Sequence, residues 1–318
     1  MRPKYMWPRT LNTEEIDPHP HQFNADLHLL DWMEAKGYEF DVATDEDLNF
    51  EGLEVLAPYS VVVTGSHPEY WSAQMLDALE AYLSQGGRLM YLGGNGFYWV
   101  TSFDPVRKHV VEVRRWHGSE AYEAAPGEYY HSTTGELGGI WRSRGRSPHK
   151  LVGNSCTAVG SDQAMPYQRQ PGSFDPRVAF IFEGIGDEEI VGDFGLQQGG
   201  AGGDEVDRLD GAQGSPPHAL LLATASGFSD VYLYFPEDVY YDQTYPSEPG
   251  QTSNAHPHVR ADMVFYELPN GGAVFSTGSI TWCGALSHNH YQNNVSRITE
   301  NVLRRFLDPA LFRRLESP

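Results

Sequence analysis

Apolar residues in the first hundred positions recur with the periods of alternating helices and strands. A helix that ends at Gly37 is predicted from apolar side chains three to four positions apart: Phe23, Leu27, Leu30 and Met33. Residues 39–44 predict a short strand. Residues 60–64 are nearly all β-branched, which is typical of a strand covered on both faces.

A second helix is predicted to begin after Ser72, a favourable N-cap residue, and to end at Gly86 and Gly87. Its inner face is formed by Met75, Leu76, Leu79, Tyr82 and Leu83. Residues 88–92 predict a third strand. The segment from 60 to 92 has the length of a right-handed βαβ crossover, so its two strands are predicted to be parallel neighbours.

Residues 106–215 differ in composition from the segments on either side. Glycine, proline, serine and charged residues dominate, and no long helical period is visible. We interpret this stretch as an insertion of strands and ordered loops rather than a linker, because its aromatic side chains require burial: Trp116, Tyr129, Tyr130, Trp141 and Phe174.

Strand patterns resume in the last third of the chain, at residues 219–223, 230–235, 262–267 and 273–277. A final amphipathic helix is predicted over residues 293–307, with Val295, Ile298, Val302, Leu303 and Phe306 directed inward. We therefore predict one α/β domain over residues 1–318. Its mostly parallel sheet is flanked by helices and shared by both ends of the chain, and residues 106–215 pack over the site.

Composition narrows the class of protein. With 40% hydrophobic and 13% aromatic residues, the 318-residue chain is not disordered. Its net charge of −21 repels phosphate backbones and anionic lipids, which predicts neither a nucleic-acid nor a membrane partner. There is no long apolar run and no secretory signal pattern, and two distant cysteines, Cys156 and Cys283, make no disulfide framework. A cytoplasmic location is therefore expected.

The string Gly-Ser-His-Pro-Glu-Tyr at residues 65–70 brings an imidazole and a carboxylate to the end of a predicted strand. Ligands of open α/β sheets bind at the carboxyl ends of the strands. His67 and Glu69 are therefore the first candidates for catalysis, and Pro68 between them restricts the backbone. A structural alternative stays open, in which His67 is a loop residue and Glu69 lies near a helix N-terminus.

Asn95 is the third candidate. It lies in the string Gly-Gly-Asn-Gly that ends the next predicted strand, so it is expected to face His67. An amide there can hold a carbonyl oxygen. A strand, a glycine turn and a helix would place Ser or Cys at this position in a nucleophile elbow. The asparagine indicates hydrolysis by water, which needs a base and often a metal ion.

Further candidates lie later in the chain. The glycine-rich loop at residues 199–208 could deliver Glu205 to His67, or it could be a solvated acidic loop. His288 and His290 follow the strand at 273–277, and histidines two positions apart are a weak metal-binding pattern. Cys283 is interpreted as a small packed residue rather than a nucleophile.

Several strings together resemble one family, the C-terminal catalytic region of the large subunit of N,N-dimethylformamidase. They lie at residues 1–5, 25–32, 44–48, 64–70, 93–99 and 278–282. The resemblance runs along essentially the whole chain. It implies a fold similar to class I glutamine amidotransferases without the cysteine nucleophile, in agreement with Asn95 at the turn.

The resemblance also implies a function. The family hydrolyses small N-substituted formamides to formate and an amine, with a mononuclear ferric iron held by two tyrosines and a carboxylate. Carried over, Glu69 would be the carboxylate ligand and His67 the general acid or base, while Asn95 would hold the substrate. Glu205 matches an acidic position of the site. The family further suggests a small partner subunit and a homo-oligomer.

This chain departs from the family pattern at its start. The two tyrosine ligands of the family precede the Arg-Pro-Lys-Tyr string, at which this chain begins, and Tyr5 is the nearest tyrosine. We expect the missing ligands in a preceding segment or another polypeptide. Two alternatives stay open. One is a non-catalytic binding or structural module that has lost its metal ligands. The other is a zinc hydrolase using His67, Glu69 and His288 or His290.

Overall fold

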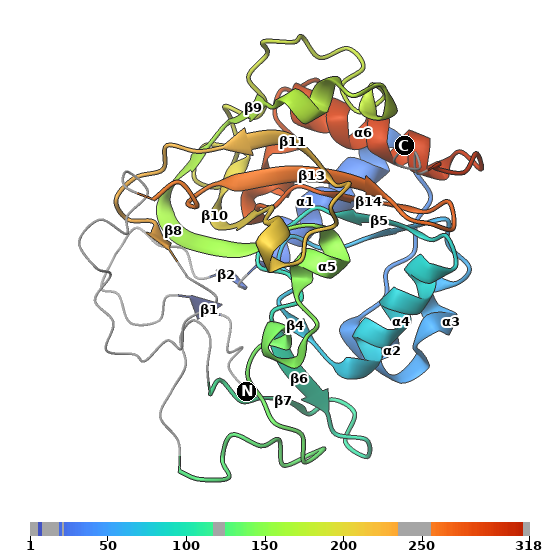
Figure 1. The fold of residues 1–318 in the computed structure, drawn as a ribbon, viewed down its shortest axis with the longest axis vertical. Helices are drawn as coiled ribbons and strands as arrows, with labels where there is room; N and C mark the ends of the chain where they lie inside the picture. The colour runs from blue at the N-terminus through green and yellow to red at the C-terminus, as the bar shows by residue number, and fades with distance from the viewer. Residues whose placement is uncertain (1–5, 8–18, 21, 117–124, 235–255, 314–318) are drawn as a thin grey trace.

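A computed structural model describes residues 6–7, 19–20, 22–116, 125–234 and 256–313 (Figure 1). The α-helices are α1 (Phe23–Lys36), α2 (Asp45–Glu51), α3 (Leu53–Leu56), α4 (Ala73–Ser84), α5 (Pro148–Val152) and α6 (Asn294–Leu307). The strands are β1 (Met6–Trp7), β2 (His19–Pro20), β3 (Val61–Val63), β4 (Tyr70–Trp71), β5 (Arg88–Tyr91), β6 (Trp99–Phe103), β7 (Val111–Val113), β8 (Ser155–Met165), β9 (Tyr167–Arg169), β10 (Gly202–Arg208), β11 (Leu220–Ala225), β12 (Leu233–Tyr234), β13 (Ala261–Glu267) and β14 (Ala273–Ser276).

A six-stranded sheet in the order β3-β5-β14-β13-β11-β9 forms the centre of the molecule. The first three strands are parallel neighbours, and the pairs β14–β13, β13–β11 and β11–β9 are antiparallel. Two three-stranded sheets, β10-β8-β12 and β4-β6-β7, lie beside it. Because β5 pairs with β14, the two ends of the chain share one sheet, as the sequence predicts.

Helices cover both faces of the central sheet. Successive residues of a strand point to opposite faces. Leu89 of β5 packs in one core cluster with α4, whereas its neighbour Met90 packs in the other with α1 and α6. Figure 1 shows α2, α3 and α4 grouped on one side of the sheet. The arrangement is an α/β architecture, which confirms the predicted fold class at that level.

Several predicted elements are confirmed. The strands β3 and β5 are parallel neighbours joined through α4, whose five predicted inner residues are all buried. The Ser72 side chain accepts a hydrogen bond from the Met75 amide and caps this helix, 3.2 Å. The predicted inner face of α6 is also buried, and Asn293 is its N-cap.

The prediction of a mostly parallel sheet is wrong for the later strands. A connection of only five residues joins β13 to β14, and such a short connection permits only antiparallel pairing. Residues 39–44 contain no strand. The strand predicted at 230–235 is β12, which pairs with β8 rather than with the central sheet.

The buried face of α1 also differs from the prediction. Phe23 and Leu27 are 58% and 44% exposed, whereas Trp32 is fully buried. The Trp32 indole donates a hydrogen bond to the Ser296 hydroxyl of α6, 2.8 Å, which fixes the rotation of α1 about its axis. Both sets of residues have helical spacing, so spacing alone could not separate them.

The segment 106–215 contributes strands to three sheets, since its strand β7 pairs with β6 in the β4-β6-β7 sheet. Its strand β9 is the edge of the central sheet, while β8 and β10 pair with each other over most of their length. Burial of the aromatic residues in this segment is confirmed only in part. Trp141 is buried as predicted, whereas Tyr130 and Phe174 are exposed. No α-helix of the described residues is long and apolar enough to cross a membrane.

Phe306 provides a test of this architecture, because it is fully buried in the cluster that joins α6 to the sheet. We expect Phe306→Ala to lower the free energy of unfolding by about 3–5 kcal/mol, measured by urea denaturation. The adjacent Leu307, 47% exposed, is the matched control, and Leu307→Ala should change stability by less than about 0.5 kcal/mol. Equal losses in the two variants would contradict the placement of α6.

Candidate active site

Two chain segments meet where β3 and β5 end. The Gly94 amide donates to the Ser66 carbonyl, 3.1 Å, and the Phe97 amide donates to the Pro68 carbonyl, 2.8 Å. A Cβ atom on Gly93 would collide with the Ser66 carbonyl oxygen. The absence of a side chain at Gly93 therefore permits the loop after β3 and the turn after β5 to lie against each other.

His67 lies between two carboxylates. Its Nε2 atom is 2.9 Å from Oε2 of Glu205 and 3.5 Å from Oε2 of Glu69. The imidazole is 6% exposed. The structure thus brings together His67, Glu69 and Glu205, including the residue that the sequence placed on a glycine-rich loop. Glu205 is in fact on β10, which pairs with β8.

Glu69 is held by two donors at its other oxygen. Its Oε1 accepts hydrogen bonds from the Trp99 indole, 2.8 Å, and from the Asn95 side-chain amide, 3.3 Å. Asn95 is buried, and its Oδ1 has no hydrogen-bond partner among the described residues. The Asn95 side chain therefore contacts Glu69 and leaves a buried oxygen without a partner among the described residues.

Asn95 adopts a left-handed backbone conformation, with φ of 47°. Asparagine tolerates this region better than most residues. The nucleophile-elbow comparison is wrong in one respect, because the turn is followed by strand β6 rather than by a helix. A helix N-terminus is therefore not available behind Asn95.

The electrostatics of the site favour a charged imidazole. Burial would lower the pKa of His67, but the carboxylate of Glu205, and then those of Glu69 and Asp204, outweigh it and raise the pKa to about 9. Burial raises the pKa of Glu69, and the charge of His67 opposes this rise. These pKa values favour a protonated imidazole at neutral pH, whereas burial brings the pKa of Glu69 to about 7.

Two of the surrounding groups were missed by sequence reasoning. Trp99 and Asp207 are almost fully buried, and each makes a hydrogen bond to a site residue or its backbone. Asp207 is two positions from Glu205, and residues two apart in a strand share a face. The sequence could have indicated Asp207 by this period of two along the strand. For Trp99 the sequence contained no signal beyond its place in the glycine-rich string at residues 93–99.

The described residues do not complete an iron site. Among them, no group of three or more His, Cys, Asp or Glu side chains could hold a metal ion. Glu69 has one oxygen occupied by two donors. The nearby Tyr70 hydroxyl is hydrogen-bonded to Arg115 and the Tyr91 hydroxyl to Asp207. Tyr5 lies outside the described residues.

The zinc alternative is also unsupported by the geometry. His288 and His290 are exposed, and His288 stacks on Phe194, whereas the His67 imidazole is buried. Cys283 is fully buried, and burial raises the pKa of its thiol well above the usual range. This agrees with its interpretation as a packed residue.

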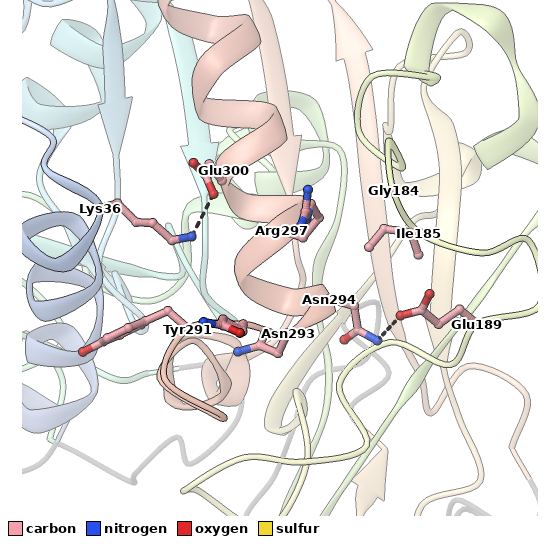
Figure 2. A pocket seen from close by; sticks show the side chains of 10 residues that line it. Lys36, Gly184, Ile185, Glu189, Tyr291, Asn293, Asn294, Arg297 and Glu300 are labelled. Atoms are coloured by element: carbon pink, nitrogen blue, oxygen red, sulfur yellow. Dashed lines mark hydrogen bonds and ion pairs between the residues drawn. The ribbon is translucent and has the colours of Figure 1, made fainter.

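A separate pocket of about 400 Å³ lies at the start of α6 (Figure 2). Its charged and polar walls are mostly paired internally: Lys36 with Glu300, 2.8 Å, and Asn294 with Glu189, 2.8 Å. None of the predicted site residues lines it. We therefore place the candidate active site at His67 and not in this pocket.

Comparisons with known proteins agree with the sequence pattern. The family described as "N,N-dimethylformamidase beta subunit-like, C-terminal" matches residues 1–293. The N,N-dimethylformamidase beta subunits of Alcaligenes sp and Paracoccus aminophilus are 49% and 48% identical over 288 residues, 90% of this chain. The matched part is 37% of the length of each relative.

A solved structure, "mmIFT52 N-terminal domain", aligns over 91% of this chain and 93% of its own, with 13% identity and a TM-score of 0.37. Likeness at this level does not identify a fold, so the amidotransferase-like topology stays a prediction. The sequence matches, in contrast, are extensive. This chain belongs to the family described as N,N-dimethylformamidase beta subunit-like, C-terminal.

Proposed function

We propose that this chain carries the catalytic groups of a hydrolase that cleaves small N-substituted formamides to formate and an amine. The names of its relatives support this substrate class. The observation that carries the proposal is the placement of one buried imidazole between the Glu69 and Glu205 carboxylates, beside the Asn95 amide, whose buried Oδ1 has no partner among the described residues.

In the proposed reaction, the Glu205 carboxylate takes a proton from water, whose oxygen adds to the formamide carbonyl carbon. His67 then donates its proton to the substrate nitrogen, the C–N bond breaks, and the amine leaves. His67 recovers a proton from Glu205 across their 2.9 Å contact. A protonated imidazole suits the role of acid, since an amine leaves poorly without a proton.

Asn95 would orient the reactants. Its Nδ2 atom has two N–H groups, of which one is directed at Glu69, so the second can donate to the substrate carbonyl. Its Oδ1 can accept a hydrogen bond from the attacking water. An amide donor that is already fixed in place stabilises charge on the carbonyl oxygen without reorganisation.

The iron of the family stays a prediction for this chain. Bound ferric iron would polarise the carbonyl and activate water, and Glu69 would supply one of its oxygen ligands. Further ligands would have to come from outside the described residues. Because the matched relatives are named beta subunits, we also propose that the chain works in a complex with a second kind of subunit. A homo-oligomer remains a prediction.

Replacing Glu205 should change the charge state of His67. Glu205→Gln removes the nearest negative charge, so we expect the pKa of His67 to fall from about 9, because the largest contribution that opposes burial is lost. An NMR titration of the histidine ring protons measures it. Glu300→Gln, which removes a carboxylate paired with Lys36, is the control. An unchanged His67 pKa in Glu205→Gln would contradict the electrostatic account.

Activity should depend on His67. We expect His67→Ala to lower kcat/KM for N,N-dimethylformamide by roughly 10²–10⁴-fold, measured as dimethylamine release by the complete protein with iron supplied. The exposed His290 gives a control of the same residue type, and His290→Ala should retain full activity. Undiminished turnover in His67→Ala would rule out its role as acid.

The pH profile should show an alkaline limb. A group whose folded pKa is raised to about 9 keeps its proton below that pH and loses it above. We therefore expect kcat/KM to fall as the pH rises through about 9, because His67 then loses the proton that it donates to the leaving amine. Activity that rises steadily through this range would indicate that His67 acts as a base instead.

A further inference from the structure

The backbone of the turn after β5 is pinned at every amide from Gly94 to Tyr98. The amides of Gly94, Phe97 and Tyr98 donate to carbonyl oxygens of the loop at residues 66–69, at 3.1, 2.8 and 3.0 Å. The amides of Asn95 and Gly96 donate instead to side chains. The Asn95 amide binds Oδ1 of Asp207, 2.8 Å, and the Gly96 amide binds the Tyr91 hydroxyl, 2.7 Å.

Asp207 and Tyr91 act as one unit. The Tyr91 hydroxyl donates to Oδ2 of Asp207, 2.7 Å, so both carboxylate oxygens accept a hydrogen bond. Both side chains are buried to 1% exposure or less. A Cβ atom on Gly96 would lie 2.8 Å from the Tyr91 ring, so the glycine permits this approach. The pair holds Asn95 in its left-handed conformation, which an unrestrained residue rarely adopts.

The strand β10 connects this unit to the imidazole. It carries Glu205, which contacts His67, and Asp207, which contacts the turn. The Asp207 amide in turn donates to the Gly278 carbonyl, 2.9 Å, which ties this end of β10 to the segment after β14. A single strand thus sets the position of the imidazole's partner and the backbone of the amide residue.

We propose that Asp207, together with Tyr91, is a positioning residue that holds the Asn95 amide against Glu69 and the substrate. The consequence for catalysis rests on the proposed function, whereas the consequence for the turn does not. A carboxylate suits this position because its two oxygens accept from both partners. An asparagine at 207 has a single oxygen, so either the Asn95 amide or the Tyr91 hydroxyl proton would lose its acceptor.

The test uses Asp207→Asn and Tyr91→Phe in the complete protein. The first converts one oxygen to a donor, and the second removes a single hydroxyl and disturbs packing least. Asp262→Asn and Tyr266→Phe are matched controls. Asp262 is also fully buried and accepts from the Leu209 amide, 2.9 Å, and the Tyr266 hydroxyl donates to the Leu151 carbonyl, 2.5 Å. The hydrogen bonds of both control side chains are made outside the turn at residues 93–98.

The first measurement is hydrogen exchange at the Asn95 and Gly96 amides. We expect exchange to accelerate by at least about tenfold in Asp207→Asn and Tyr91→Phe, and to stay unchanged in the two controls. Unchanged amide exchange in Tyr91→Phe would overturn the proposal. This result decides the test even if Asp207→Asn does not fold.

The second measurement is kcat/KM for N,N-dimethylformamide, with Asn95→Ala as a third variant. If Asp207 acts through Asn95, the double variant Asn95→Ala/Asp207→Asn should be no less active than Asn95→Ala alone. If the fold-loss in kcat/KM of the double variant equals the product of the two single fold-losses, the catalytic part of the proposal is overturned. Accelerated exchange in a protein whose wild type hydrolyses no formamide would support the positioning role and reject the proposed function.

Discussion

Burial of the His67 imidazole works against its charge, and the neighbouring carboxylates restore it. A charged group without partners in such a place would lose its proton, so the contact with Glu205 decides the chemical state of the site. The other features follow from this pair. The loop at residues 65–70, which follows β3, has to bring His67 close to β10. The turn after β5 has to leave room for the side chains of His67 and Glu205.

The secondary structure of much of the first third of the chain, and the last helix, could be predicted from the sequence. The β3-α4-β5 unit and α6 depend on periodic burial and capping between neighbours in the chain, and such patterns are visible in one sequence. The same applies to His67, Glu69 and Asn95. Each follows a recognisable strand, and parallel strands bring their carboxyl ends to one edge.

Features that depend on distant partners could not be predicted. Periodicity does not encode which strands pair, so the partners of β11 and β13 could not be predicted, although the short connection between β13 and β14 was a visible signal for antiparallel pairing. The rotation of α1 depends on the hydrogen bond from Trp32 to Ser296. Asp207 precedes Arg208 in the chain, but its carboxylate lies against Tyr91 and Asn95, more than a hundred positions away.

Neutron diffraction from crystals of the complete protein near neutral pH would test the central claim most directly, because it locates hydrogen at the ring nitrogens of His67. The account predicts deuterium on both ring nitrogens of His67. An Nε2 atom without deuterium, with the proton on Glu69 or Glu205 instead, would contradict the assignment of His67 as the proton donor.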